Sequence, residues 1–175
     1  MQPQSILNFC FEELTAKQHF VKDAALDETV RAQFGDTLEA AAQELFAWRT
    51  TAEGRQAEII VLEQFSRNVY RNTQHATRRA PLRRTRWRLW PAGKTAACHR
   101  AARVCLRALV HSESALVHTQ AIALFSQLGI KNSLDFELRH KALIDRFSPP
   151  HRNAILGRSS TAEELTFLSE PGYSF

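Results

Sequence analysis

The chain has 175 residues, 44% of them hydrophobic, and a net charge of +5 at pH 7, and this length fits a single domain over residues 1–175. Six glycines and six prolines exclude collagen-like and low-complexity classes, and no apolar run approaches the roughly 20 residues that a membrane-spanning helix needs. Three cysteines without a CxxC pair form no disulfide framework, so we expect a protein of the reducing cytoplasm without membrane insertion.

The first predicted element is a long amphipathic helix. Charged residues occupy its other faces, as contact with water requires. Gly35 lies inside this segment and marks a position where we expect a bend. The apolar residues that recur every three or four positions, and so share one helix face, are Leu26, Val30, Phe34, Leu38, Ala41 and Leu45.

A second helix is predicted to begin at Thr50-Thr51-Ala52-Glu53 and to run to about Tyr70. Its start is a capping-box pattern, in which a hydroxyl and a carboxylate satisfy free backbone N–H groups. Residues 59–62 are four consecutive apolar side chains, which indicates burial on several sides of the helix. We therefore expect this helix to be central.

Residues 77–109 form a strongly basic segment. They contain nine arginines and Lys94 but no acidic residue, so removing these ten charges from +5 leaves the rest of the chain at −5. Pro81, Pro91 and Gly93 interrupt helix formation. We expect a loosely packed segment beside a helical body.

Beyond this segment, apolar residues between Leu116 and Leu128 predict a third helix, which Gly129 ends. Ser112 is the expected N-cap of this helix. Glu113 is expected in the first turn, where a carboxylate complements the positive helix end.

Two more helices follow. One begins at Asn132 or Ser133 and stops before Pro149-Pro150; the other begins at a second capping-box pattern, residues 160–163, and ends before residues 171–172. No alternating strand pattern is present. We therefore predict an all-α fold of antiparallel helix pairs, closing over a shared apolar interior.

Polar side chains on the second helix follow a regular spacing. Gln64, Arg67, Asn68 and Arg71 lie at i, i+3, i+4 and i+7 and share a face, and Glu63 is placed to pair with Arg67. One interpretation is a solvated stripe. The alternative is a donor-rich face turned toward a cleft that suits an anionic ligand.

Other donors follow the basic segment. Among them, His111 is a candidate general base or anion ligand, with a purely structural role in a capped turn as the alternative. No histidine or cysteine spacing typical of a metal site, no phosphate-binding glycine loop and no nucleophile elbow is present, so we predict neither a metal nor a cofactor. The candidate ligand-binding residues are Gln64, Arg67, Asn68, His111, Arg139, His151, Arg152, Asn153 and Arg158.

Several short motifs are spread along the chain: residues 6–11, 17–20, 53–55, 63–68, His111-Ser112-Glu113, 151–158 and 170–175. Together these motifs resemble the DUF924 family of bacterial proteins. Cys10 and His19 stand where the family typically has tryptophan, and Ser66 where it has proline. The resemblance implies a tetratricopeptide-like, all-helical fold and no established activity.

Residues 76–110 depart from the family pattern. One hypothesis is out-of-frame translation, because arginine, tryptophan and cysteine without acidic residues are typical of GC-rich DNA read in a wrong frame. The rival hypothesis takes the segment as genuine, with guanidinium and indole groups stacking on unpaired RNA bases. Independent sequencing of the gene distinguishes the two.

Three functions remain open on the sequence. The first is a binding module for an acidic peptide or a small anionic ligand. The second is an enzyme of unknown class, with catalytic candidates His111, Glu113 and His151 and an arginine that stabilises negative charge. The third is RNA binding through residues 77–109; nucleic acid is the partner that we favour least.

Overall fold

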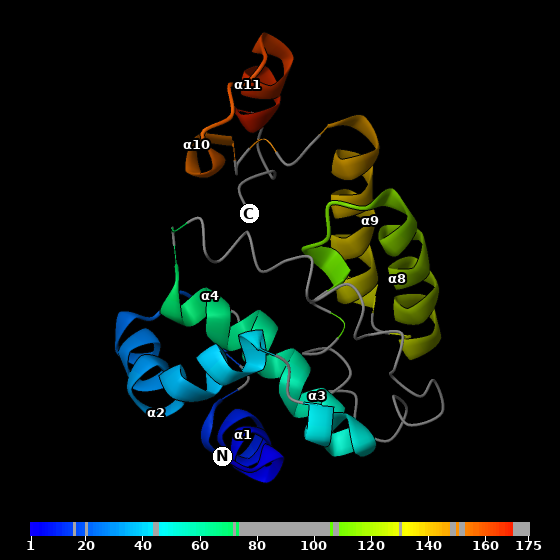
Figure 1. The fold of residues 1–175 in the computed structure, drawn as a ribbon. Coiled ribbons are helices and arrows are strands. Elements are labelled where there is room, and N and C mark those ends of the chain that lie inside the picture. Colours follow the sequence, from blue (N-terminus) through cyan, green and yellow to red (C-terminus); the bar gives the residue numbers. More distant parts are fainter. Residues whose placement is uncertain are drawn as a thin grey trace.

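The computed structural model describes most of the chain outside the basic segment. No strand occurs in the described ranges, so the prediction of an all-α fold is confirmed (Figure 1). None of the helices in this part of the chain is long and apolar enough to cross a bilayer. The described residues are 1–15, 17–19, 21–43, 46–71, 73, 106, 109–129, 131–147, 150 and 153–169.

Helices before the basic segment form one group, α8 and α9 lie side by side, and α10 and α11 lie beyond them (Figure 1). Of the short elements, η1 and η3 are π-helical turns and η2 is a 3₁₀ helix. The elements are α1 (Pro3–Asn8), η1 (Phe9–Glu13), α2 (Ala24–Ala42), η2 (Phe46–Thr50), α3 (Ala52–Ile60), η3 (Val61–Phe65), α4 (Ser66–Val69), α8 (Ala115–Leu128), α9 (Lys131–Arg146), α10 (Asn153–Leu156) and α11 (Ala162–Ser169).

Helix α2 is the first predicted helix. The Asp23 carboxylate caps it by accepting hydrogen bonds from the backbone N–H groups of Ala25 and Leu26, at 3.0 and 3.2 Å. Gly35 lies within an uninterrupted helix of 19 residues. Leu45 falls outside the described residues.

The predicted central helix is present as α3, η3 and α4 in succession. Its cap lies one residue later than predicted: the Thr51 hydroxyl accepts from Gly54 N–H at 3.0 Å, and Thr50 instead donates to the carbonyl of Ala47 at 2.9 Å. Thr50 belongs to the preceding 3₁₀ helix η2, and this explains the shift. A glycine therefore occupies the position where a capping box needs a carboxylate.

The start of α8 also differs from the prediction. Ser114, not Ser112, is the N-cap residue, and no acidic residue lies in the first turn, so Glu113 precedes the helix. Ser112 belongs to a turn of its own: its N–H donates to the carbonyl of Leu109 at 2.9 Å, and its hydroxyl accepts from Ser114 N–H at 3.1 Å. The predicted end at Gly129 is confirmed, with a left-handed φ of 66° that glycine adopts without a steric cost.

Two further predicted caps are corrected. Helix α9 begins at Lys131, so Asn132 and Ser133 lie inside its first turn. The capping box of α11 consists of Thr161 and Glu164, because the Thr161 hydroxyl accepts from Glu164 N–H at 3.2 Å and the Glu164 carboxylate accepts from Thr161 N–H at 2.8 Å. Glu164 is buried there, whereas the predicted partner at position 163 is exposed.

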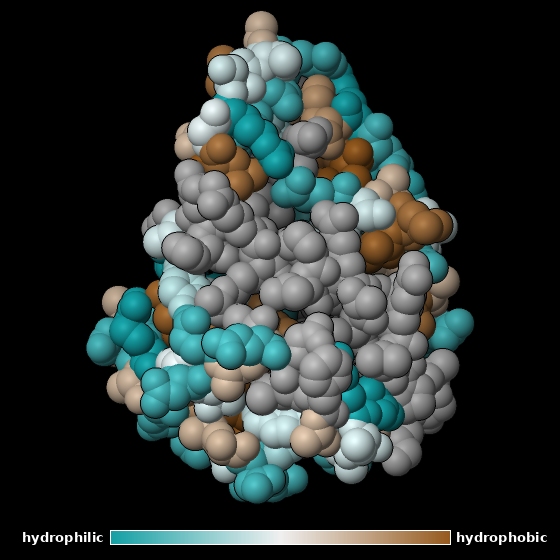
Figure 2. Space-filling model, viewed as in Figure 1, coloured by the Kyte–Doolittle hydropathy of each residue, from teal (hydrophilic) through white to brown (hydrophobic). Residues whose placement is uncertain are grey.

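Buried apolar residues of the described part form two clusters. The first lies among α1 to α4 and contains three packed rings, with centroids of Phe9 and Phe65 each 4.8 Å from that of Phe34. The second lies between α8, α9 and the residues Leu106, Leu109 and Val110, around Phe125. Figure 2 shows further hydrophobic side chains at the surface near α8 and α9, two helices whose large exposed apolar residues include Leu116.

Candidate functional site

Three ionisable side chains from the two halves of the described chain meet beside η3. Glu63 lies in this π-helical turn and is almost fully buried, and Nη1 of Arg67, one turn later, lies 3.5 Å from its Oε1. The same Nη1 contacts Nε2 of His111, which itself lies 3.7 Å from Oε1 of Glu63. We call this group the Glu63–Arg67–His111 cluster.

Hydrogen-bond chemistry fixes the roles within this cluster. An arginine guanidinium only donates, so Nε2 of His111 accepts from Arg67 and carries no proton of its own. The Arg67 side chain is 37% exposed and that of Glu63 only 4%. The partly exposed guanidinium of Arg67 thus lies beside the buried carboxylate of Glu63.

Helix α9 contributes a second ring to the cluster. The imidazoles of His111 and His140 meet edge to face with centroids 6.3 Å apart. Nδ1 of His140 donates to the carbonyl of Phe136 at 3.0 Å, and the two rings of these residues pack at 4.3 Å. These contacts hold His140 in place beside His111.

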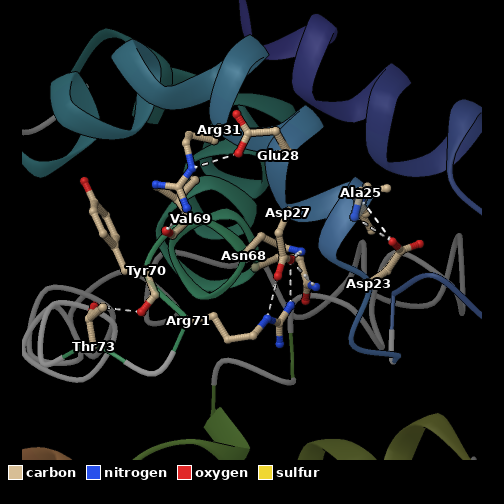
Figure 3. A network of polar contacts seen from close by, with 12 residues as sticks. Asp23, Ala25, Asp27, Glu28, Arg31, Asn68, Val69, Tyr70, Arg71 and Thr73 are labelled. Atoms are coloured by element: carbon tan, nitrogen blue, oxygen red, sulfur yellow. Dashed lines mark hydrogen bonds and ion pairs between the residues drawn. The ribbon is translucent and has the colours of Figure 1, made fainter.

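A separate polar network ties α4 to α2 (Figure 3). Nε and Nη2 of Arg71 donate to both carboxylate oxygens of Asp27, at 2.6 and 2.7 Å, and Asn68 donates to the same carboxylate at 2.7 Å. Gln64 reaches Asn68 and the carbonyl of His19, both at 3.4 Å. The predicted polar stripe therefore divides: Arg67 joins His111, while Asn68 and Arg71 bind α2.

Asp27 gives this network a pH dependence. Burial alone would raise the pKa of Asp27, but hydrogen bonds from Arg71 and Asn68, with the nearby charge of Arg31, outweigh it and hold that pKa below its ordinary value of 3.8. The resulting stabilisation is complete above about pH 5 and declines as the pH falls through the folded-state pKa.

We therefore expect D27N to weaken the loss of stability on acidification. The free energy of unfolding, measured by urea titration between pH 7 and pH 3, should fall less steeply in D27N than in the natural protein. The exposed Asp36, replaced as D36N, is the matched control and should leave the slope unchanged. Equal slopes for D27N and the natural protein would contradict the role assigned to Asp27.

The remaining predicted residues lie elsewhere. Asn153 is buried and donates to Ser160 and Glu164, at 3.1 and 3.3 Å, so it fastens the start of α11. Arg158 lies 3.8 Å from Glu113, with its side chain 46% exposed. Arg139 is exposed and lies over the Phe136 ring. None of the described contacts joins these residues to the Glu63–Arg67–His111 cluster.

Some predictions fall outside the described residues. His151 and Arg152 are two such residues. The basic segment is also outside, apart from residues 106 and 109, and so is the RNA-binding role predicted for it. Among the residues that the structure does describe, no group of three histidine, cysteine or acidic side chains is placed to hold a metal ion.

The sequence did not predict a buried histidine–glutamate pair between α8 and α9. His118 of α8 and Glu137 of α9 are fully buried, with Nδ1 and Oε1 2.6 Å apart. A signal was available, because His118 shares the spacing of Ala121 and Phe125 and so lies on the apolar face of its helix. A histidine in that position needs a buried partner, and the sequence alone does not say which.

Comparisons with known proteins agree on the fold and give no activity. The family model described as "Bacterial protein of unknown function (DUF924)" matches residues 6–172. A solved structure of a protein of unknown function from Agrobacterium tumefaciens, ATU0120, is similar with a TM-score of 0.87 and 30% identity, over 95% of this chain and 96% of that one. No curated protein matches the sequence.

Proposed function

This chain belongs to the DUF924 family of bacterial proteins, whose function is unknown, and we propose from its own geometry that it binds a small anionic ligand or an acidic peptide. The Glu63–Arg67–His111 cluster is the proposed site. The observation that carries the proposal is that two neighbouring arginines, Arg67 and Arg71, differ in which of their guanidinium nitrogens make hydrogen bonds.

Arg71 has its Nε and Nη2 edge occupied, since these atoms donate hydrogen bonds of 2.6 and 2.7 Å to Asp27. Arg67 differs, because both of its contacts within the described chain use a single nitrogen, Nη1. The edge formed by Nε and Nη2 is left to bind a ligand. That edge presents two parallel N–H donors, the geometry that a carboxylate or phosphate accepts.

Buried Glu63 supports this arrangement. Its carboxylate attracts Nη1 of Arg67 at 3.5 Å, and the Nε and Nη2 edge lies on the other side of the guanidinium from this contact. The ring of His111 limits the movement of the same nitrogen from the other side. A side chain that is held before binding loses less conformational entropy when the ligand arrives.

An enzyme is the second candidate function. The observation that favours it is the 3.7 Å distance between the Glu63 carboxylate and Nε2 of His111, since a carboxylate beside an imidazole is a common acid–base arrangement. Glu113, the carboxylate named on the sequence, lies instead beside Arg158. In the arrangement described, Arg67 occupies the lone pair of His111. Binding therefore needs fewer rearrangements than proton transfer does.

The test is a thermal-shift and calorimetric titration with inorganic phosphate, citrate and a hexaglutamate peptide. At least one of these should raise the melting temperature of the natural protein. R67Q should weaken that binding about tenfold or more, because hydrogen bonds to a charged group contribute roughly 1.5–3 kcal/mol. R146Q is the matched control: Arg146 is 61% exposed and pairs with Glu163 at the surface. Unchanged binding by R67Q would refute the assignment.

A further inference from the structure

We propose that His118 and Glu137 form a proton-holding pair that positions His111 in the binding site. The inference rests on the proposed function, since it concerns the same site. It extends that function to two buried residues that touch no ligand and act through the backbone of Ser112.

Geometry links the pair to the loop. Nδ1 of His118 lies 2.6 Å from Oε1 of Glu137, and Nε2 of the same ring lies 2.9 Å from the carbonyl oxygen of Ser112. Ser112 directly follows His111. Both side chains of the pair are 0% exposed, so water does not compete for these hydrogen bonds.

The donors and acceptors determine how many protons the pair holds. A carbonyl only accepts, so Nε2 of His118 carries a proton and donates it to Ser112. A second proton must then lie between Nδ1 of His118 and Oε1 of Glu137. If it were absent, the lone pair of Nδ1 would face a carboxylate oxygen in a buried site, which is repulsive.

Two observations place that second proton on Glu137. Within the described chain, its Oε2 is buried without a hydrogen-bond partner, which costs far less for a neutral carboxyl than for a carboxylate. Burial also raises the pKa of Glu137, against the opposing effects of His118 and of the Lys141 charge one turn later. We therefore assign the second proton of the pair to the carboxyl of Glu137.

The consequence for His111 follows from the loop. Ser112 is held at its N–H by Leu109, at its hydroxyl by Ser114 and at its carbonyl by His118. The third of these contacts joins the loop to α8, and Glu137 fixes the ring that makes it. The ring of His111 can meet Arg67 only while this backbone keeps its place.

A pH dependence opposite to that of Asp27 follows. Because the pKa of Glu137 is raised, its contribution to stability is complete below the ordinary glutamic acid value of 4.5 and is lost as the pH rises through the folded-state value. The charged or titratable groups that act on Glu137 are His118 from α8 and Lys141 from α9.

Two variants of Glu137 provide the test. E137Q keeps a donor to Nδ1 of His118 without a titrating group, whereas E137L removes the donor. E164Q changes another buried carboxylate, in the capping box of α11, and is the matched control. Circular dichroism first establishes that each variant is folded.

Nuclear magnetic resonance gives a readout that needs no ligand. In the natural protein, ¹⁵N spectra of His118 should show one ring nitrogen with a proton and one without. The nuclear Overhauser contact between the rings of His111 and His140 should persist in E137Q and E164Q and disappear in E137L. Two protonated nitrogens on His118, or a persistent contact in E137L, would overturn the proposal.

Binding is measured in parallel with inorganic phosphate as the probe. E137L should weaken it about tenfold because His111 is no longer held in its binding position, and E137Q should leave it within about twofold. Should the natural protein bind no anion, the proposed function fails while the resonance experiment still decides the positioning role. Unchanged phosphate binding by E137L, where the natural protein does bind, would also refute that role.

Discussion

Replacement of Gly54 by alanine should destabilise the protein by about 3 kcal/mol or more, the largest effect that we expect from the loss of a glycine. A Cβ atom at this position would lie 1.9 Å from the carbonyl oxygen of Trp48 and 2.7 Å from its carbonyl carbon. Both are backbone atoms, so no side-chain rotation relieves the contact. The chain turns here from η2 into α3.

The change is measured as the free energy of unfolding in urea, with the melting temperature as a second observable. About 3 kcal/mol corresponds to a fall of roughly 6–12 °C for a chain of this size. Gly35 is the matched control, because it lies in the interior of α2 with open space around its position. G35A should stabilise the helix by about 0.5–1 kcal/mol, and equal effects of G35A and G54A would contradict the steric argument.

Replacement of Phe65 by alanine should cost about 3–5 kcal/mol, the usual range for a large aromatic ring removed from a core. Phe65 is 0% exposed, and its ring packs at 4.8 Å on Phe34 and edge to face at 5.8 Å on Phe9. These two rings come from α2 and η1, so Phe65 joins three elements.

This ring also bears on the binding site. Phe65 ends the π-helical turn that contains Glu63, and its burial fixes how that turn is rotated. F65A should therefore weaken phosphate binding as well as lower the free energy of unfolding. F65L is the conservative control and should cost less than F65A, because it leaves a smaller cavity. If F65A lowered the free energy of unfolding by less than about 1 kcal/mol, the cluster of three packed rings would be contradicted.

The residues of the site were partly accessible to sequence reasoning. The sequence predicts one polar stripe of Gln64, Arg67, Asn68 and Arg71; the structure places the first three on η3 and α4 and Arg71 just beyond the end of α4. The division of this stripe between two partners was not foreseen, because Asp27 lies 41 residues before Asn68 in the chain and His111 lies 44 residues after Arg67. Contacts between residues so far apart produce no regular spacing that could be recognised in a single sequence.

The errors of one residue at the predicted caps of α3 and α11 have a common cause. At Thr51 and at Thr161, two hydroxyl residues stand next to each other, and the local pattern fits either of them. Burial of Glu164 and the 3₁₀ helix η2 before Thr51 decide which hydroxyl caps the helix. The burial of Glu164 is a tertiary feature, and the cap at Thr51 depends on the helix that precedes it.

By itself, the sequence determined the all-helical class and the approximate limits of the main helices. These follow from apolar spacing and from hydrogen bonds between neighbouring residues, which act over a few positions of the chain. Only the tertiary structure decided that Arg67 meets His111, that Arg71 is held by Asp27, and that His118 faces Glu137. Charge and hydrogen-bond partners are selected by which helices pack together, and that depends on contacts between distant segments.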